Sequence, residues 1–268
     1  MMITHYSKLE LYTVSVAGVK QFYHDQLGFP IVHESESEIV FQPTVHFTLS
    51  FWQAAEALTP AHLAFEVAHS AFDQAVDRLR ERGVTLLKWP DGRTIDDFGT
   101  GQNVYFRDGD GHLLEIISHT YVQEGVLPPS GEFGILYLRE VGFPVDDVIA
   151  FRERLVQLLA VKLDKVYDNF TFAIGGTAHA VLASKERKWF PIGMTALPPK
   201  MHVTFGVSSA DFLAQVRTAL EAKEIRYKKA ENGGLHVTLG GYSLGMQVAS
   251  FPEEAPALLG LPCSGKGM

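Results

Sequence analysis

The stretch from His62 to Ile117 decides the fold of this chain. It opens with the apolar segment His62-Leu-Ala-Phe-Glu-Val67, which is typical of a strand. It closes with Val104-Tyr-Phe-Arg-Asp-Gly-Asp-Gly-His-Leu-Leu-Glu115-Ile-Ile, where alternating apolar residues flank a tight turn at positions 108–111. A histidine at the start of one strand and a glutamate on a later strand are potential metal ligands. Only the fold brings two such residues together.

A helix is predicted between these strands. Ser70 is the expected N-cap, and Gly83 stands where the residue just past a helix is usually glycine. Apolar residues recur at helical spacing, which predicts one buried helix face made of Phe72, Ala75, Val76 and Leu79.

The same order of one strand, one helix and three strands is predicted four times along the chain. The segment from Pro60 to Val67 resembles the segment from Lys200 to Val207, with His62 matched by His202. The last strand of the first unit, with His46, resembles a later strand with His179. Gln247 stands where Glu115 stands in the earlier copy. We therefore expect four βαβββ modules in an α+β fold.

Residues 121–133 are predicted to be a linker, because two prolines and two glycines interrupt all periodicity there. The expected division is an N-terminal domain over residues 1–120, a more diverged C-terminal domain over 134–250 and an irregular tail over 251–268.

The composition excludes several classes of protein. The formal net charge is -8 and the chain has no basic run, which argues against binding to a nucleic-acid backbone. The sequence has no apolar run long enough to span a bilayer and no signal-peptide core. The single cysteine, Cys263, cannot form an internal disulfide, which fits a reducing compartment. We expect a cytoplasmic protein that binds neither nucleic acid nor a membrane.

The first helix and its end carry Phe22-Tyr23 and Leu27-Gly28-Phe29. With the module order above, these residues resemble the vicinal oxygen chelate superfamily. That superfamily includes glyoxalase I, bleomycin-resistance proteins and extradiol dioxygenases. The resemblance implies four βαβββ modules paired into two tandem glyoxalase-like domains.

The resemblance also implies a metal site. The family's first ligand position falls on Lys8, and the second and third fall on His62 and Glu115. A protonated lysine has no lone pair to give a metal. The first domain therefore carries two of the three expected ligands.

Three residues are candidates for the missing ligand. His46 is favoured because His179 recurs at the matching place, and Glu10 and His5 are the alternatives. By the same resemblance, a candidate second site comprises His179, His202 and Gln247.

A site of two histidines and one glutamate suits Fe, Mn, Zn or Ni. The family chemistry implies a small substrate whose two neighbouring oxygens bind the metal, which acts as a Lewis acid. A lyase or isomerase is favoured over an extradiol dioxygenase, because the segment from Thr94 to Gln102 lacks the histidine expected of that class. No catalytic residue beyond the ligands is assigned from the sequence.

The alternative is a metal-free protein of the bleomycin-resistance type that binds or sequesters a small molecule. Lys8 supports it, because a salt bridge from Lys8 to Glu115 would replace the metal. Lys8 and Glu10 would lie in the pocket, and the expected aromatic lining is Phe47, Phe51, Trp52 and Tyr105. A homodimer is allowed but not required, because four modules can complete both sheets within one chain.

Overall fold

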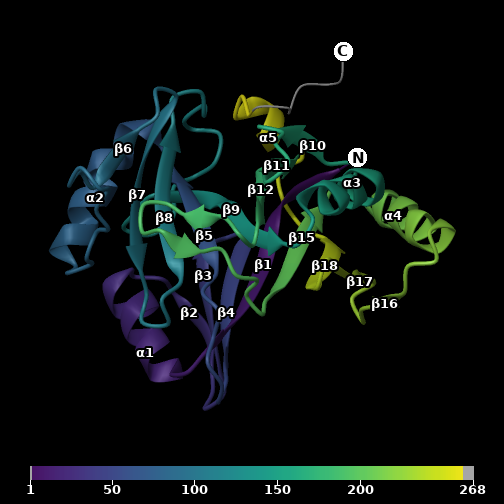
Figure 1. Cartoon of the computed structure of the whole chain (residues 1–268), viewed down its shortest axis with the longest axis horizontal. Coiled ribbons are helices and arrows are strands. Elements are labelled where there is room, and N and C mark those ends of the chain that lie inside the picture. The colour runs from purple at the N-terminus through teal and green to yellow at the C-terminus, as the bar shows by residue number, and fades with distance from the viewer. Residues whose placement is uncertain (1, 262–268) are drawn as a thin grey trace.

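Two eight-stranded sheets form the molecule in the computed structural model, which describes residues 2–261. Sheet A has the strand order β16-β17-β18-β15-β1-β4-β3-β2, and sheet B has the order β10-β11-β12-β9-β5-β8-β7-β6. Figure 1 shows α1 and α2 on one side of the molecule and α3 and α4 on the other, with the long strands between them. No helix within residues 2–261 has both the length and the apolar character needed to cross a membrane.

The first two modules occupy the N-terminal half. The first comprises β1 (Ile3–Thr13), α1 (Val16–Lys20), the π-helix η1 (Gln21–Gln26), β2 (Ile31–Glu34), β3 (Glu38–Thr44) and β4 (Phe47–Gln53). The second comprises β5 (His62–Val67), the 3-10 helix η2 (His69–Ala71), α2 (Phe72–Glu81), β6 (Ile95–Asp97), β7 (Gly101–Arg107) and β8 (Leu113–His119).

The last two modules follow the linker. The third comprises β9 (Ile135–Val145), α3 (Val148–Leu159), β10 (Lys162–Asp164), β11 (Phe170–Gly175) and β12 (Ala178–Ser184). A small hairpin of β13 (Lys188–Trp189) and β14 (Met194–Thr195) comes next. The fourth comprises β15 (His202–Val207), α4 (Ala210–Ala222), β16 (Tyr227–Lys229), β17 (Leu235–Leu239) and β18 (Tyr242–Val248). The predicted α+β fold of four modules is confirmed.

The predicted irregular tail contains a short helix, α5 (Ala255–Leu258). The rest of that tail, residues 262–268 with Cys263, lies outside the described residues.

Each sheet joins modules from both halves of the chain. Antiparallel pairing of β1 with β15 joins the first and fourth modules in sheet A. Antiparallel pairing of β5 with β9 joins the second and third modules in sheet B. The division at residues 120 and 134 follows the order of the modules, but neither sheet is confined to one half. The strand beside β5 is therefore β9 and not β1.

The helices bury the faces that their spacing predicts. In α2, the predicted side chains Phe72, Ala75, Val76 and Leu79 are buried, and Gly83 has a positive φ of 74° just past the helix. The prediction of Ser70 as N-cap is wrong. Ser70 lies in η2, where its N–H and hydroxyl both donate to the Glu124 carboxylate. The Ser70 side chain therefore bonds to Glu124, which is distant in the sequence, and does not cap α2 as the local sequence predicts.

Cutting the chain at the predicted boundary is expected to leave two pieces that do not fold separately. Fragment 1–120 would expose the edges of β1 and β5, and fragment 121–268 would expose the edges of β9 and β15. These edges pair with one another in the whole protein. Co-expression should give a one-to-one complex with native circular dichroism and size. A monomeric fragment 1–120 that unfolds cooperatively would contradict the shared sheets.

Candidate metal centre

Three buried side chains meet on one face of sheet B. His62 begins β5, and its Nε2 lies 3.5 Å from Oε2 of Glu115 on β8. The same Nε2 lies 3.8 Å from Oε2 of Glu140 on β9. Potential ligand atoms of the three residues all lie within 4.8 Å of one another. The structure thus brings His62 and Glu115 together, as the sequence indicates, and adds Glu140 as a third.

Outer hydrogen bonds hold two of these groups in place. Nδ1 of His62 lies 3.2 Å from the carbonyl oxygen of Leu113, which can only accept. Nδ1 therefore carries a proton, and Nε2 points at the two carboxylates, where it donates to Glu140 when it is protonated and offers a lone pair when it is not. Oε1 of Glu115 accepts a hydrogen bond of 2.8 Å from the Asn103 amide. This leaves its other oxygen facing His62. An imidazole with a fixed tautomer and a positioned carboxylate fit a metal-binding role.

The two carboxyl groups have opposite pKa shifts. Burial, and then the negative charge of Glu140, raises the pKa of Glu115 well above its usual value. Burial also opposes ionisation of Glu140, but the hydrogen bond from His62 and the charge of Arg139 outweigh it and lower the pKa of Glu140. Two buried carboxylates this close repel each other unless a proton or a cation lies between them. Either a proton on Glu115 or a cation between the two carboxyl groups would relieve this repulsion.

A β-bulge on β9 places Glu140. Leu138 pairs with Phe65 and Glu140 pairs with Ala64, so Arg139 is an extra residue in this strand. A bulge bends the strand and re-aims its side chains. Here it allows the neighbours Arg139 and Glu140 both to make contacts near the centre of the sheet.

Arg139 is the centre of a buried polar network beside the site. Its Nη1 donates to the Glu66 carboxylate at 3.1 Å, and its Nη2 donates to the Tyr121 hydroxyl at 2.6 Å. The backbone N–H of His119 also donates to Glu66, at 3.0 Å. The Arg139 Nε lies 3.7 Å from Glu140. These contacts hold the Arg139 guanidinium in a fixed position beside Glu140.

A small cavity of about 140 Å³ opens beside the three side chains. It is lined by His62, Tyr105, Leu113, Glu115, Glu140, Phe170, Phe172, Val181, Arg187, Lys188, Trp189 and Phe190. The last four belong to the segment that carries β13, so this segment closes the site. The ring of Trp189 lies 5.1 Å from the ring of His62. The cavity combines aromatic walls with acidic and basic groups.

His46 does not join this cluster. It lies in the turn between β3 and β4, with its ring 6.1 Å from that of His5 and 5.1 Å from that of Phe251. His5 is on β1. His46 and His5 therefore both belong to the first module, whose strands lie in sheet A. They would lie beside His62 only if the first and second modules shared a sheet. The first module is in sheet A and the second is in sheet B.

Lys8 and Glu10 are also on β1 in sheet A, where they form an ion pair of 3.0 Å. The predicted salt bridge between Lys8 and Glu115 is therefore wrong. The strand that faces His62 comes from the third module, and it supplies Glu140 where the first module would have supplied Lys8.

The candidate second site is divided between the sheets. His179 lies on β12 in sheet B, in register with Glu140 on the neighbouring strand. His202 lies on β15 in sheet A, and Gln247, on β18, accepts a hydrogen bond from Asn232. Within residues 2–261, the His179 Nε2 is buried without a hydrogen-bond partner. His179 therefore belongs beside the first cluster and not with His202.

The predicted aromatic lining separates in the same way. Phe47 and Phe51 are buried in the hydrophobic core, so their assignment to a pocket is wrong. Trp52 lines a hollow of sheet A, and Tyr105 lines the cavity of sheet B. The residue that sequence reasoning missed is Glu140. Its signal was the adjacent pair Arg139-Glu140 within an otherwise apolar strand, where charges need partners.

Comparison with known proteins supports the same fold. Residues 3–116 match the model of the Glyoxalase/Bleomycin resistance protein/Dioxygenase superfamily. Metallothiol transferase FosB of Shouchella clausii is 31% identical over 96 residues, which span 32% of this chain and 64% of that protein, less than two thirds of its length.

Two solved structures match most of the chain. A candidate dioxygenase from Bacillus subtilis superimposes with a TM-score of 0.65 and 13% identity over 97% of this chain and 90% of its own. Glyoxalase I from Zea mays gives a TM-score of 0.59 and 12% identity over 90% of this chain and 91% of its own. At these identities the likeness concerns the fold alone.

Replacing Arg139 by methionine is expected to destabilise the protein strongly, because Glu66 would remain buried without its cation. The expected loss is about 3–5 kcal/mol of unfolding free energy. Urea unfolding followed by circular dichroism measures it. The matched control is Arg80→Met, which removes an exposed ion pair on α2 and should change stability little. Equal effects of the two substitutions would contradict the role assigned to Arg139.

Proposed function

Because residues 3–116 match the model of the Glyoxalase/Bleomycin resistance protein/Dioxygenase superfamily, we propose that the chain is a divalent-metal-dependent enzyme of this superfamily that acts on a small substrate with two adjacent oxygen atoms. The observation that carries this proposal is the cluster of His62, Glu115 and Glu140 in the lining of the small cavity of sheet B. The imidazole and carboxylate donors of this cluster fit a divalent transition metal.

The residues that would hold the metal are His62, Glu115 and Glu140. Imidazole and carboxylate donors suit Fe, Mn, Zn or Ni. When bound, such an ion supplies Lewis-acid stabilisation of negative charge on a substrate oxygen.

Glu140 is the group best placed to move a proton. Its side chain is 11% exposed against 2% for Glu115, so it has the better access to the cavity. The low pKa caused by His62 and Arg139, against the cost of burial, keeps it ionised and able to accept a proton. We infer that its carboxylate removes a proton from a substrate carbon next to a carbonyl. This is the chemistry of an isomerase or lyase.

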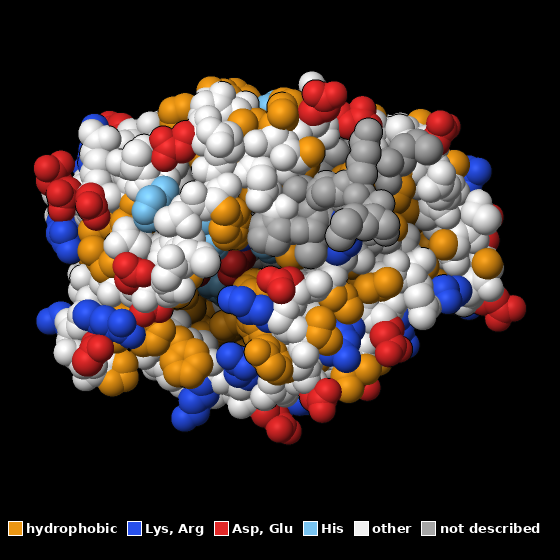
Figure 2. All heavy atoms as spheres, turned by 90° about the horizontal axis from the view of Figure 1, so that it is seen from above, with side chains coloured by type: hydrophobic (Ala, Val, Ile, Leu, Met, Phe, Trp, Pro, Cys, Tyr) orange, Lys and Arg blue, Asp and Glu red, His pale blue; other side chains and the backbone are white. Residues whose placement is uncertain are grey.

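The cavity restricts what can enter. A space of about 140 Å³ admits only a small molecule, and the buried Trp189 excludes water from one side. Arg187 and Lys188 give this wall positive charge. Figure 2 shows acidic and basic side chains interspersed over the face seen from above, without a broad field of one sign. Selection by charge would therefore occur within the cavity, in favour of an anionic substrate.

A ring-cleaving dioxygenase has less support. Among the described residues that line the cavity, His62 is the only histidine, and it is already a proposed ligand. The segment from Thr94 to Gln102 adds no other. The metal-free binding protein also loses its main argument, because Lys8 lies in sheet A. A homodimer and a cytoplasmic location stay predictions.

Metal analysis of protein purified without an affinity tag tests the site. Near-stoichiometric Fe, Mn, Zn or Ni is expected. His62→Ala and Glu140→Gln should each weaken metal binding by at least ~100-fold, since outer partners of ligands alone are worth about 10–100-fold. His46→Ala is the control, because it changes a histidine outside the cluster and should retain the metal. Wild-type protein that stays metal-free after reconstitution would refute the enzyme and favour a binding protein.

Proton exchange tests the role of Glu140 separately. The metal-loaded protein is expected to exchange deuterium from D2O into the carbon next to the carbonyl of small anionic hydroxy-carbonyl compounds, as seen by proton NMR. Glu140→Asp keeps a carboxylate donor. In variant protein reconstituted to full metal content it should slow exchange by about 10²–10⁴-fold, because a displaced base transfers protons poorly. Exchange at an unchanged rate, in variant protein with full metal content, would assign the base to another group.

A further inference from the structure

Sheet A has a histidine at the position that His62 occupies in sheet B. His202 begins β15 just as His62 begins β5. Two residues past His62, Ala64 pairs with Glu140 on one neighbouring strand and with Glu115 on the other. The matching pairs in sheet A decide whether His202 also lies among metal ligands.

Those pairs in sheet A carry no carboxylate. Thr204, two residues past His202, pairs with Lys8 on one side and with Gly245 on the other. A Cβ atom at position 245 would lie 3.0 Å from the His202 Nε2, so the imidazole ring uses the space that a side chain there would need. Within residues 2–261, the groups of residues able to hold a metal include none from this part of sheet A. His202 therefore has a different set of partners.

His202 lies between a serine and a glutamate on its two neighbouring strands. It is in register with Ser243 on β18 and with Glu10 on β1. Its Nδ1 lies 2.7 Å from the Ser243 Oγ, and its Nε2 lies 3.8 Å from the Glu10 Oε2. In sheet B, the residue of β8 in register with His62 is Leu113, so that sheet has no serine at this place.

The surroundings of His202 keep its imidazole neutral and direct its hydrogen bonds. Burial lowers the pKa of His202, and the charges of His236 and Lys8 act in the same direction, whereas the charge of Glu10 opposes them. The ionised Glu10 carboxylate can only accept, so it favours the tautomer with the proton on Nε2. The Ser243 hydroxyl then donates to the lone pair on Nδ1. A neutral imidazole in this position is able to take the proton of the serine.

The three side chains are accessible from one hollow in sheet A. This hollow has a volume of about 560 Å³, and Ser243, His202 and Glu10 all belong to its lining. The side chains of His202 and Glu10 are each 20% exposed. The rest of the lining is Tyr12, Trp52, Gln53, Pro199, Lys200, Met201 and Gly241. A small molecule in this hollow can therefore reach the serine and the histidine together.

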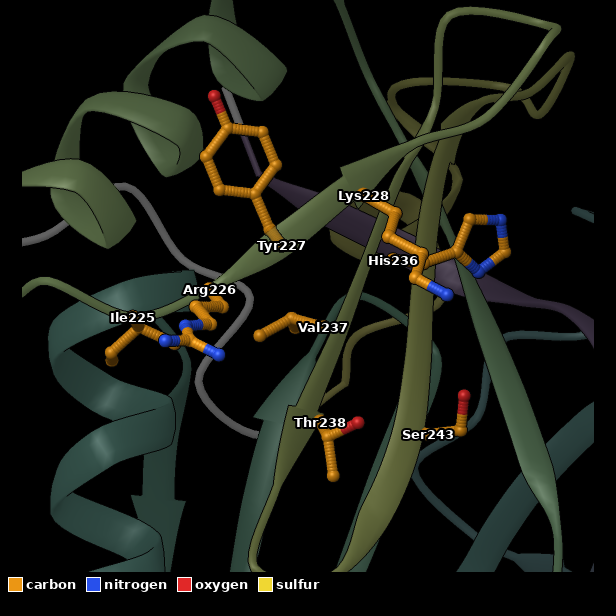
Figure 3. A pocket seen from close by; sticks show the side chains of 8 residues that line it. All are labelled: Ile225, Arg226, Tyr227, Lys228, His236, Val237, Thr238 and Ser243. Atoms are coloured by element: carbon orange, nitrogen blue, oxygen red, sulfur yellow. The ribbon is translucent and has the colours of Figure 1, made fainter.

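Ser243 also lines a second hollow, of about 740 Å³, which adjoins the first. Figure 3 shows the Ser243 hydroxyl directed toward Lys228 and His236 on this side. The two adjoining hollows form the sheet A cleft, and Ser243 lies where they meet. The hydroxyl is thus open to attack a group that lies in the cleft.

Acyl transfer also needs donors for the negative charge that develops on the substrate oxygen. The Lys200 side chain belongs to the lining of the first hollow. Gly241, two residues before Ser243, lies there as well, and its N–H donates to no other residue in the range 2–261. Both donors are available to a substrate oxygen.

We propose that Ser243, His202 and Glu10 form a second, metal-independent site that hydrolyses small uncharged carboxylic esters. The Ser243 Oγ attacks the ester carbonyl carbon while its proton passes to the His202 Nδ1. The bond from this carbon to the alkoxy oxygen breaks, and the leaving alcohol takes the proton.

Water completes the reaction. Its oxygen attacks the carbonyl carbon of the acyl group on Ser243, and His202 accepts its proton. The bond to the Ser243 Oγ then breaks, and this oxygen recovers the proton from His202. The products are one carboxylic acid and one alcohol. Glu10 is a positioning residue, because it acts through the imidazole and does not touch the substrate.

Acetylation by p-nitrophenyl acetate tests this site in the full chain, kept metal-free with a chelator. A burst of about one p-nitrophenolate per chain is expected, because an acyl-enzyme accumulates. Peptide mass spectrometry of the wild type should find the acetyl group on Ser243. His202→Gln should slow acetylation by about 10²–10⁴-fold, the usual contribution of a general base. The matched control is Ser7→Ala, which changes a serine of the same sheet that donates to a backbone carbonyl and should leave the burst unchanged.

Glu10→Gln tests the positioning role. It should lower kcat, leave KM unchanged and move the midpoint of the pH profile for acetylation downward, because the carboxylate that raises the pKa of His202 is gone. Lys8 loses its ion pair in this variant and acts in the same direction, while His236 is unaltered. An unchanged midpoint would remove Glu10 from the site.

Three results would overturn the proposal. The first is wild-type protein without an acetyl group on Ser243. The second is equal acetylation of the wild type and His202→Gln, which would make Ser243 an ordinary surface serine. The third is turnover that persists in Ser243→Ala with a native circular dichroism spectrum, which would place hydrolysis elsewhere. Because the protein is metal-free throughout, none of these results depends on whether the metal centre is active.

Discussion

The antiparallel pairing of β5 with β9 is the constraint on which the candidate metal centre depends. It sets Glu140 opposite Ala64, two residues from His62, and the parallel strand β8 brings Glu115 from the other side. The bulge at Arg139 adjusts this register by one residue. A strand without that bulge would place other side chains on this face, because neighbouring positions point to opposite sides. One strand pairing therefore brings together two candidate ligands, His62 and Glu140, that are 78 residues apart along the chain.

Burying charged side chains at such a site destabilises the fold, and nearby ion pairs and hydrogen bonds compensate part of this energy. Glu66 and Arg139 neutralise each other at 3.1 Å, and His119 and Tyr121 occupy further hydrogen-bonding positions of this pair. Glu115 and Glu140 have no such full compensation, since His62 is their main partner. The two sets of buried charges therefore differ in how far the protein itself compensates them. The first network is complete within the protein, whereas the second gains from a cation.

The two sheets share one architecture and have diverged in charge. At equivalent positions, sheet B carries two carboxylates and sheet A carries a lysine and a glycine. The hairpin of β13 and β14 closes the cavity of sheet B, whereas the cleft of sheet A is wide. Equivalent positions of duplicated modules can therefore carry a cluster of candidate metal ligands in one sheet and a lysine and a glycine in the other.

The sequence by itself determined the module order, the helix faces and the pair of His62 and Glu115. These depend on local periodicity and on internal repetition, which are visible along the chain. Only the tertiary structure decided which modules share a sheet, because strand pairing between distant segments leaves no local pattern. That choice removed Lys8, His5 and His46 from the site and introduced Glu140. The physical reason is that a ligand set is defined by strands that are neighbours in the sheet, and sequence order does not specify those neighbours.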